Sequence, residues 1–346
     1  MTSSERAFNL DGPGELLETL PYLLGFHPHD SVVLVGLDQT RLVVTTRIDL
    51  DSAADRSVVD DSVRILLRAR ASMAIVVVYA APTDVPVRSA PRGQPLPHES
   101  VATAVKIALR AAGLSWLDTL FVQDGYWWSY PGREAACSCC VEGTRLPGDH
   151  ATGPAAAVFA GMQAYPSRDA LEAVLDPDPA LDHGWQLSLI EAAELQLVQA
   201  TPSGGRDREL RSVKRALFAA AREADRSLFP QPANVASSAT LARFAVGLRE
   251  ISIRDALWLA IDQQRLDGRG FWLQLLQRLP APYDSAPLFL FGWASWRDGN
   301  GTLASIAAQR ALISRPGYTA AELLLSAVQN GLDPYRTPKL RASGRT

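Results

Sequence analysis

Two stretches of the first 150 residues, Ser31–Leu37 (SVVLVGL) and Met73–Ala80 (MAIVVVYA), are apolar at nearly every position. Unbroken apolar character over this length predicts strands that are buried on both faces of a sheet. Arg41–Leu50 follows the first stretch after a short turn, which predicts an antiparallel hairpin. Two further strands are predicted at Leu117–Val122 and Tyr126–Tyr130.

Helical periodicity fills the intervals between these strands. Apolar residues spaced three and four apart predict helices at Glu15–Leu24, Asp55–Arg70 and Glu99–Ala112. Gly25 directly follows the first of them and can end it in the left-handed conformation. Strands that alternate with helices indicate a mixed, partly parallel sheet covered by helices. We therefore predict an α/β domain with a mixed sheet over residues 1–150.

The strand pattern stops after residue 150. We predict a helical connector over residues 151–205 and an all-α, tetratricopeptide-like region over residues 206–346. The first helices of this part are predicted at Gly153–Ala164, Ser167–Leu175, Trp185–Ala200 and Asp207–Leu228.

The last third of the chain contains an internal repeat. The turns Asp267–Gly270 (DGRG) and Asp298–Gly301 (DGNG) lie 31 residues apart, each between apolar helical segments. In the ~34-residue tetratricopeptide frame, Gly292, Ala304 and Ala311 occupy the positions at which small residues let paired helices approach closely. The first copy fits this frame poorly, because Trp258 and Gln277 fall where small residues belong. The region is therefore predicted to be tetratricopeptide-like without being a true array.

Composition excludes several classes of protein. The chain has 346 residues and a formal net charge of −3, so it lacks the basic surplus typical of proteins that bind nucleic acid or anionic membranes. Its apolar runs are far shorter than the ~20 residues of a membrane helix, and its first residues do not resemble a secretory signal. We expect a cytoplasmic protein that binds neither nucleic acid nor membrane.

The densest candidate chemistry lies in the turn before the first strand. His27, His29 and Asp30 place three potential metal ligands within four residues, and Arg47 and Asp49 share one face of the second strand. The alternative is structural, with a turn in which Asp30 binds local N–H groups and an ion pair between Arg47 and Asp49.

A second candidate site follows the fourth strand. Ligands in α/β sheets bind at the carboxyl ends of parallel strands. If the third and fourth strands are parallel, Asp124, Trp127 and Trp128 line a cleft at that edge, together with the cysteines that follow. Plain packing of the loop is the competing interpretation.

Three cysteines lie close together, at Cys137, Cys139 and Cys140. With His150 they could form a Cys3His zinc site, although adjacent cysteines rarely both reach one tetrahedral ion. Free thiols are the alternative. No phosphate-binding loop, dinucleotide fingerprint, HExxH or GxSxG sequence is present, which removes the common nucleotide-binding, zincin and serine-hydrolase classes.

Several stretches together resemble one family. They are LPYLLGFHPHDSVVLVGL followed by TRIDL, the WWSY strand with its cysteine pair, and the terminal WRDGNGTLASIAAQRAL, PGY and GLDP. The chain is similar in these to the actinobacterial domain of unknown function 4192 family. The resemblance implies an actinobacterial cytoplasmic protein of that fold and no particular activity. Family members carry a cysteine earlier in the loop and a proline after the cysteine pair. Here Pro131–Ala136 lacks that cysteine and Val141 replaces the proline, which argues against a shared metal site.

These observations favour an interaction or regulatory protein that binds a protein partner through its helical region, since helical hairpins with small-residue seams present grooves to peptides and helices. The alternative is an enzyme, or a sensor of a small ligand or metal, with its cleft at the strand ends of the α/β domain.

Overall fold

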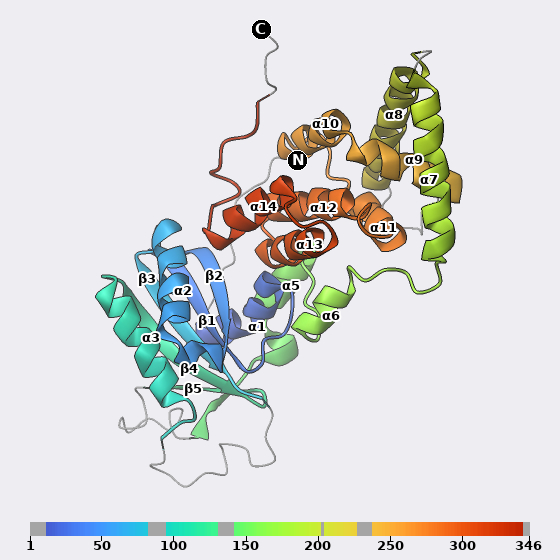
Figure 1. The fold of residues 1–346 in the computed structure, drawn as a ribbon. Coiled ribbons are helices and arrows are strands. Elements are labelled where there is room, and N and C mark those ends of the chain that lie inside the picture. Colours follow the sequence, from blue (N-terminus) through green and yellow to red (C-terminus); the bar gives the residue numbers. More distant parts are fainter. Residues whose placement is uncertain (1–11, 82–94, 131–141, 202–203, 227–236, 342–346) are drawn as a thin grey trace. The chain divides into compact units, whose positions relative to one another are not determined.

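A computed structural model describes residues 12–81, 95–130, 142–201, 204–226 and 237–341 (Figure 1). The chain divides into two compact units, the first ending at Leu171 and the second beginning at Glu172. We call them the α/β unit and the helical unit and describe each by itself.

The α/β unit is built on a six-stranded mixed sheet with the order β2-β1-β3-β4-β5-β6. Its strands are β1 (Ser31–Asp38), β2 (Arg41–Asp49), β3 (Met73–Tyr79), β4 (Ser115–Gln123), β5 (Tyr126–Ser129) and β6 (Thr144–Arg145). β3 and β4 are parallel and the other neighbours are antiparallel, including the β1–β2 hairpin. The prediction of a mixed sheet is therefore confirmed, whereas the pattern of residues did not reveal the two-residue strand β6.

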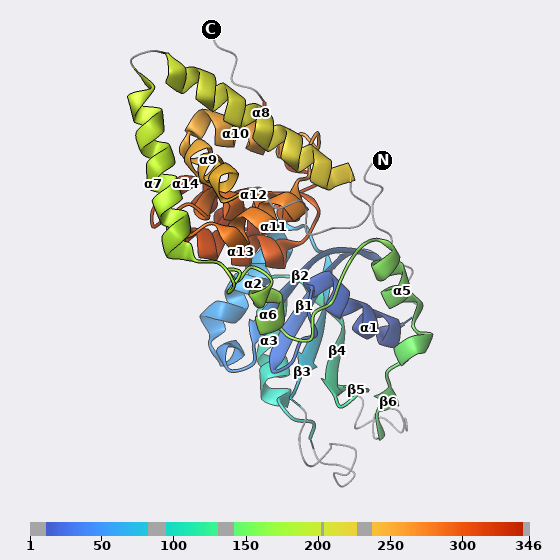
Figure 2. The same ribbon diagram turned by 90° about the vertical axis from the view of Figure 1, so that its right-hand side faces the viewer.

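Helices cover both faces of this sheet (Figure 2). α2 (Arg56–Arg68) and α3 (Glu99–Ala111) pack on one face, where alternate strand residues such as Val32, Val78 and Phe121 enter their core. The opposite face is covered by α1 (Pro13–Leu24), whose leucines are buried. Since successive strand residues point to opposite faces, both faces of the central strands are apolar.

A carboxylate of α1 caps the start of α5 (Thr152–Phe159). Glu15 accepts hydrogen bonds from the backbone N–H groups of Thr152 and Gly153 at the start of α5, the latter at 2.9 Å. These two N–H groups, Gly153 first, hold the pKa of Glu15 below its usual range. α5 ends at Phe159 rather than at the predicted Ala164, because Gly161 turns the chain at φ 79°.

The helical unit contains no strand among its described residues. The short α6 (Arg168–Ala173) lies at the division between the units, and the helices that follow are α7 (His183–Gln199), α8 (Gly205–Arg226), α9 (Ser238–Arg249), α10 (Ile251–Asp262), α11 (Arg269–Arg278), α12 (Ser285–Arg297), α13 (Gly301–Ser314) and α14 (Thr319–Gln329). Every residue of α12 is buried, so α12 is the centre of this unit.

Gly292 of α12 is a point of close approach between helices. A Cβ atom there would lie 2.8 Å from Leu324 Cδ2 and 3.1 Å from Ala307 Cβ, so α13 and α14 both press on this position. Arg269 links the two glycine turns by binding Asp267 at 2.8 Å and Asp298 at 2.7 Å. An all-α second part is confirmed for the described residues, and its likeness to tetratricopeptide repeats stays a prediction.

Candidate functional site

The carboxyl ends of β3 and β4 form one edge of the sheet with the start of β1 and the end of β2. A single row of register partners crosses the sheet just inside this edge: Asp49, Ser31, Tyr79, Val122, Trp127 and Thr144. All of them point to the face that α1 covers, because the next row belongs to the core under α2 and α3.

Asp30 holds this edge together. Its carboxylate accepts a hydrogen bond from the N–H of Ala81 at 2.9 Å, and its carbonyl accepts one from the N–H of Leu50 at 2.8 Å. Asp30 thus joins the start of β1 to the ends of β2 and β3, and it does so with φ at 43°. The side chains of His27 and His29 are exposed beside it. The structure therefore gives Asp30 a structural task and brings no third ligand to the histidines among the described residues.

Arg47 lies next to the histidine turn. Its guanidinium is 2.6 Å from the Asp49 carboxylate and 5.8 Å from the centre of the Phe26 ring. Only 11% of its side chain is exposed. A buried cation that is stacked on an aromatic ring and paired with a carboxylate stabilises the edge of β2.

The two tryptophans of β5 point in opposite directions. Trp128 is buried in the core under α2 and α3, 5.6 Å from the Phe121 ring, whereas Trp127 faces α1. Asp124 is exposed in the tight turn between β4 and β5, with φ at 50°. The structure therefore places these three residues in three different environments.

Of the four residues predicted for a zinc site, Cys137, Cys139 and Cys140 lie outside the described residues. His150 is exposed at the end of the short 3-10 helix Gly148–His150. In the described parts of the chain, no three His, Cys, Asp or Glu side chains gather as a metal site would require.

Sequence reasoning missed a group of buried donors on the α1 face. Ser31 Oγ, Tyr79 OH and Trp127 Nε1 are buried, and none has a hydrogen-bond partner in the part of the chain that the structure describes. Trp127 Nε1 lies beside Gly14 of α1, and Glu18 is one turn further along that helix. Burial raises the pKa of Tyr79, and the nearby Glu18 carboxylate raises it further, so Tyr79 stays a neutral donor. In the sequence, the only indication of these buried donors was Tyr79, a single tyrosine at the end of the aliphatic strand β3.

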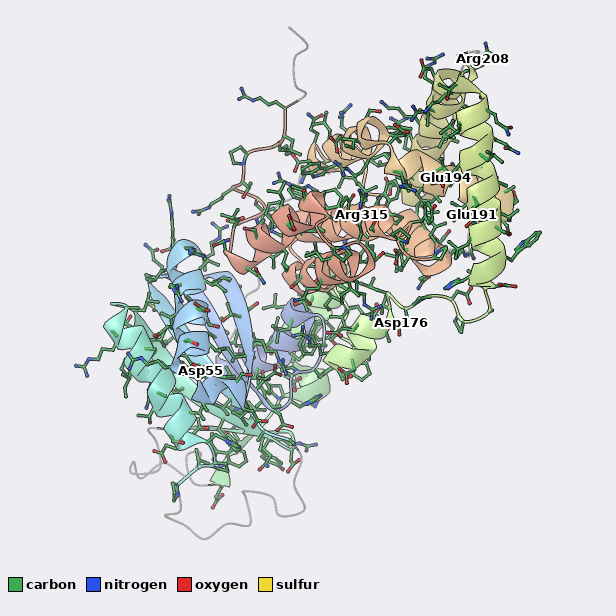
Figure 3. All side chains as sticks on the ribbon, viewed as in Figure 1. Asp55, Asp176, Glu191, Glu194, Arg208 and Arg315 are labelled. Atoms are coloured by element: carbon green, nitrogen blue, oxygen red, sulfur yellow. The ribbon has the colours of Figure 1, made fainter. Side chains whose placement is uncertain are left out.

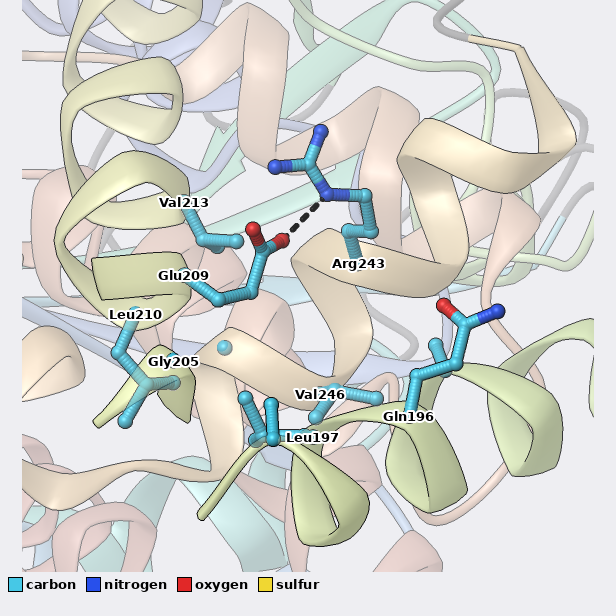
Figure 4. A pocket seen from close by; sticks show the side chains of 11 residues that line it. Gln196, Leu197, Gly205, Glu209, Leu210, Val213, Arg243 and Val246 are labelled. Carbon is cyan, nitrogen blue, oxygen red and sulfur yellow. Dashed lines mark hydrogen bonds and ion pairs between the residues drawn. The ribbon is translucent and has the colours of Figure 1, made fainter. Parts of the chain in front are cut away.

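The helical unit contains a groove of about 360 Å³ between α7, α8 and α9 (Figure 4). Its floor is apolar, from Leu197, Leu210, Val213 and Val246. One wall carries an ion pair in which Arg243 Nε donates to Glu209 Oε1 at 2.6 Å. The volume lies within the ~300–1,000 Å³ typical of ligand pockets.

Comparison with protein-family models finds a match to "Domain of unknown function (DUF4192)" over residues 13–335, nearly the whole chain. The chain belongs to the DUF4192 family. No curated protein and no solved structure matches it.

Membership of the DUF4192 family assigns no reaction and no ligand, so function has to be argued from this chain's own geometry. Among the described helices of this DUF4192 chain, none combines the length and apolar character needed to cross a bilayer. Two regions remain as candidates, the sheet edge with its buried donors and the groove of the helical unit.

Proposed function

We propose that this protein is an interaction protein whose helical unit binds an amphipathic helix of a partner protein in the groove between α7 and α8. The observation that carries the proposal is the groove itself, an apolar floor left open by three helices. An amphipathic helix inserts its apolar side chains into such a groove.

Small residues make the groove hollow. α7 ends close to where α8 begins, and the two helices diverge from there (Figure 2). Ala193, Ala200 and Gly205 line the space between them, and none of these side chains is large enough to fill it. Larger residues at these positions would close the groove, so its shape is set directly by the sequence.

α8 also carries a basic stripe, on the side of the helix away from the groove. Arg208, Arg211 and Arg215 are exposed at a spacing of three and four (Figure 3 labels Arg208), whereas Glu209, Leu210 and Val213 line the groove. None of the three arginines has an ion-pair partner among the described residues. The stripe therefore suits acidic groups of a partner that extends beyond the groove.

α7 extends the apolar surface. Ile190 and Leu197 face inward, yet Trp185, Leu195 and Val198 on the same helix are 57–67% exposed. A helix that is apolar on both sides is usually covered on both sides. The outer side of α7 therefore adds contact area for a partner that is larger than a single helix.

A direct test uses synthetic helices of about five turns. One is amphipathic and acidic, one is amphipathic and basic, and one contains the acidic peptide's residues in scrambled order. We expect the full-length chain to bind both amphipathic helices and not the scrambled peptide, as measured by fluorescence anisotropy. Ala193→Phe fills the groove and should weaken binding about tenfold or more, the effect of losing one central contact.

Ala192→Phe is the matched control, because Ala192 is the neighbouring residue on α7 and faces solvent. It should change the affinity less than about twofold. Equal binding of all three peptides, or equal effects of the two alanine substitutions, would overturn the proposal. Tighter binding of DNA than of the amphipathic helices would count against it as well.

A small-ligand site at the sheet edge is the second candidate, and the unpartnered Tyr79 and Trp127 donors near Glu18 favour it. Buried donors are normally paired, so an acceptor from a ligand would supply what the described chain lacks. A thermal-shift screen with small carboxylates and phosphates tests this candidate. Stabilisation that Tyr79→Phe removes would support it, and an unshifted melting temperature with every compound would refute it.

A further inference from the structure

The C-terminal segment Asp333–Arg341 lies against the ends of α10 and α12, and one buried arginine holds it there (Figure 1). Arg297, the last residue of α12, donates to the main-chain carbonyl oxygens of Pro334, Thr337 and Pro338. The Thr337 bond is 3.1 Å and the Pro338 bond 3.4 Å. Arginine carries several donors in a fixed plane, which suits it to contact successive carbonyl groups.

Asp262, the last residue of α10, completes the arrangement. Its carboxylate is fully buried, accepts from Arg297 Nε at 2.7 Å and Trp293 Nε1 at 3.0 Å, and also accepts the main-chain N–H of Leu340. The neighbouring Gln263 donates to the Leu340 carbonyl at 3.0 Å. Both the N–H and the carbonyl group of Leu340 are thus hydrogen-bonded to the end of α10.

The segment contributes mainly its backbone to this contact. Pro338 and Lys339 are exposed, and the half-exposed Tyr335 donates a hydrogen bond from its hydroxyl to the Asp298 carbonyl at 3.1 Å. Lys339 reaches only the surface side chain Gln264, at 2.8 Å. A site that binds main-chain atoms depends little on sequence, so another extended segment with the same backbone geometry can take the same bonds.

A buried pair of charges is also unusual for a site that only fixes a terminal segment in place. Two buried charges are costly to desolvate, and apolar residues would hold a terminal segment at least as well. A fixed carboxylate and guanidinium are suited instead to bind an extended peptide backbone that arrives and leaves with its own polar groups. Both charged residues come from helix ends in a packed core, and they bind each other directly as well as the segment.

We propose that Asp262, Gln263 and Arg297 form a binding site for the main chain of an extended peptide. The chain's own segment Asp333–Arg341 occupies this site, and an extended segment of a partner protein replaces it. This site is separate from the α7–α8 groove, and the proposal does not depend on that groove.

The test uses the full-length chain and a labelled synthetic peptide with the sequence of residues 333–341. Leu340→Pro removes the N–H that binds Asp262 and so loosens the chain's own segment, whereas Leu340→Ala keeps that N–H. The Leu340→Pro chain should bind the labelled peptide about tenfold more tightly than the wild-type chain, since a hydrogen bond to a charged group is lost. The Leu340→Ala chain should bind it as the wild type does, within about twofold.

A second experiment places the same two substitutions in the peptide and measures the binding of both peptides to one protein variant. Against the Leu340→Pro chain, the alanine peptide should bind like the original, and the proline peptide should lose about tenfold in affinity. Equal binding of the alanine and proline peptides, or equal binding by the alanine and proline chains, would show that the segment is a fixed part of the fold and overturn the proposal.

Discussion

In the α/β unit, Ser31, Tyr79 and Trp127 bury polar atoms that have no partner among the described residues, whereas in the helical unit Asp262 and Arg297 bury two charges with many partners. The helical unit also buries Trp258 Nε1 and Ser295 Oγ without a partner among the described residues, so the contrast concerns the charged helix ends and not every buried polar atom. It follows from what surrounds these groups. A sheet uses its backbone groups within the sheet, and its faces here are aliphatic. Helix ends leave backbone carbonyls and N–H groups free, and the chain that follows them adds more.

The comparison teaches where each unit can recognise another molecule. Polar recognition in the helical unit is built at the ends of α10 and α12, where a passing chain supplies the partners. Polar groups on the α1 face of the sheet are sealed under a helix, and at Asp30 the polar groups bind the sheet's own strands. Substitutions in both units test this contrast.

The largest effect is expected at Arg297. Arg297→Met leaves the Asp262 carboxylate buried without its cation, which should lower the free energy of unfolding by about 3–5 kcal/mol. Arg310→Met removes a cation that pairs with the largely exposed Asp176, and it should cost less than about 1 kcal/mol. Urea unfolding of both variants measures the difference. Similar losses would mean that the buried pair is no more important than a surface pair.

Two glycines of the helical unit should respond with opposite signs. Gly292→Ala inserts a methyl group 2.8 Å from the buried Leu324 and should cost about 1–3 kcal/mol. Gly270 in α11 has open space around its Cβ position, so Gly270→Ala should stabilise the helix by about 0.5–1 kcal/mol. Thermal unfolding distinguishes them, and two shifts of the same sign would contradict the close approach of α12, α13 and α14.

Glu15→Gln removes a charged cap in the α/β unit and should cost about 1 kcal/mol at pH 7. The pKa of Glu15 lies below its ordinary value of 4.5 in the folded chain. The contribution of its charge is therefore fully present above pH 4.5 and is lost as the pH falls through the lowered folded pKa. The stability difference between wild type and variant should shrink when unfolding is measured near pH 3. A difference that does not change with pH would show that the charge is irrelevant.

The smallest effect separates two buried tyrosines of the same unit. Tyr130 donates to the Pro97 carbonyl at 2.8 Å, so Tyr130→Phe should cost about 1 kcal/mol. Tyr79 has no partner among the described residues, so Tyr79→Phe should be neutral or slightly stabilising. If Tyr79→Phe costs as much as Tyr130→Phe in chemical unfolding, the Tyr79 hydroxyl already has an acceptor in the unliganded chain, and the sheet-edge candidate loses its unpaired donor.

Local pattern was enough to predict the main elements. The apolar runs and the short turn between them gave the β1–β2 hairpin, and Gly25 ends α1 in the left-handed conformation at φ 86°, as its position indicated. The small residues Gly292 and Ala304 meet across α12 and α13, at positions where small residues were predicted. These features depend on neighbours within a few turns of the chain.

The candidate sites were less predictable, because their chemistry depends on contacts between distant segments. The sequence placed His27, His29 and Asp30 together, but only the sheet register shows that Asp30 binds Ala81 and Leu50. From the sequence we predicted that Trp127 and Trp128 line the same cleft. Because successive residues of a strand point to opposite faces, the two side chains lie on opposite sides of the sheet.

The sequence by itself therefore determined the helices, most strands and the small-residue seam, because periodicity and glycine conformation act locally. Only the tertiary structure decided which polar groups meet. Arg297 lies about forty residues before the carbonyls that it binds, and the groove of the helical unit is lined by residues of α7, α8 and α9 together. Such meetings are fixed by the packing of whole helices, which sequence spacing does not encode.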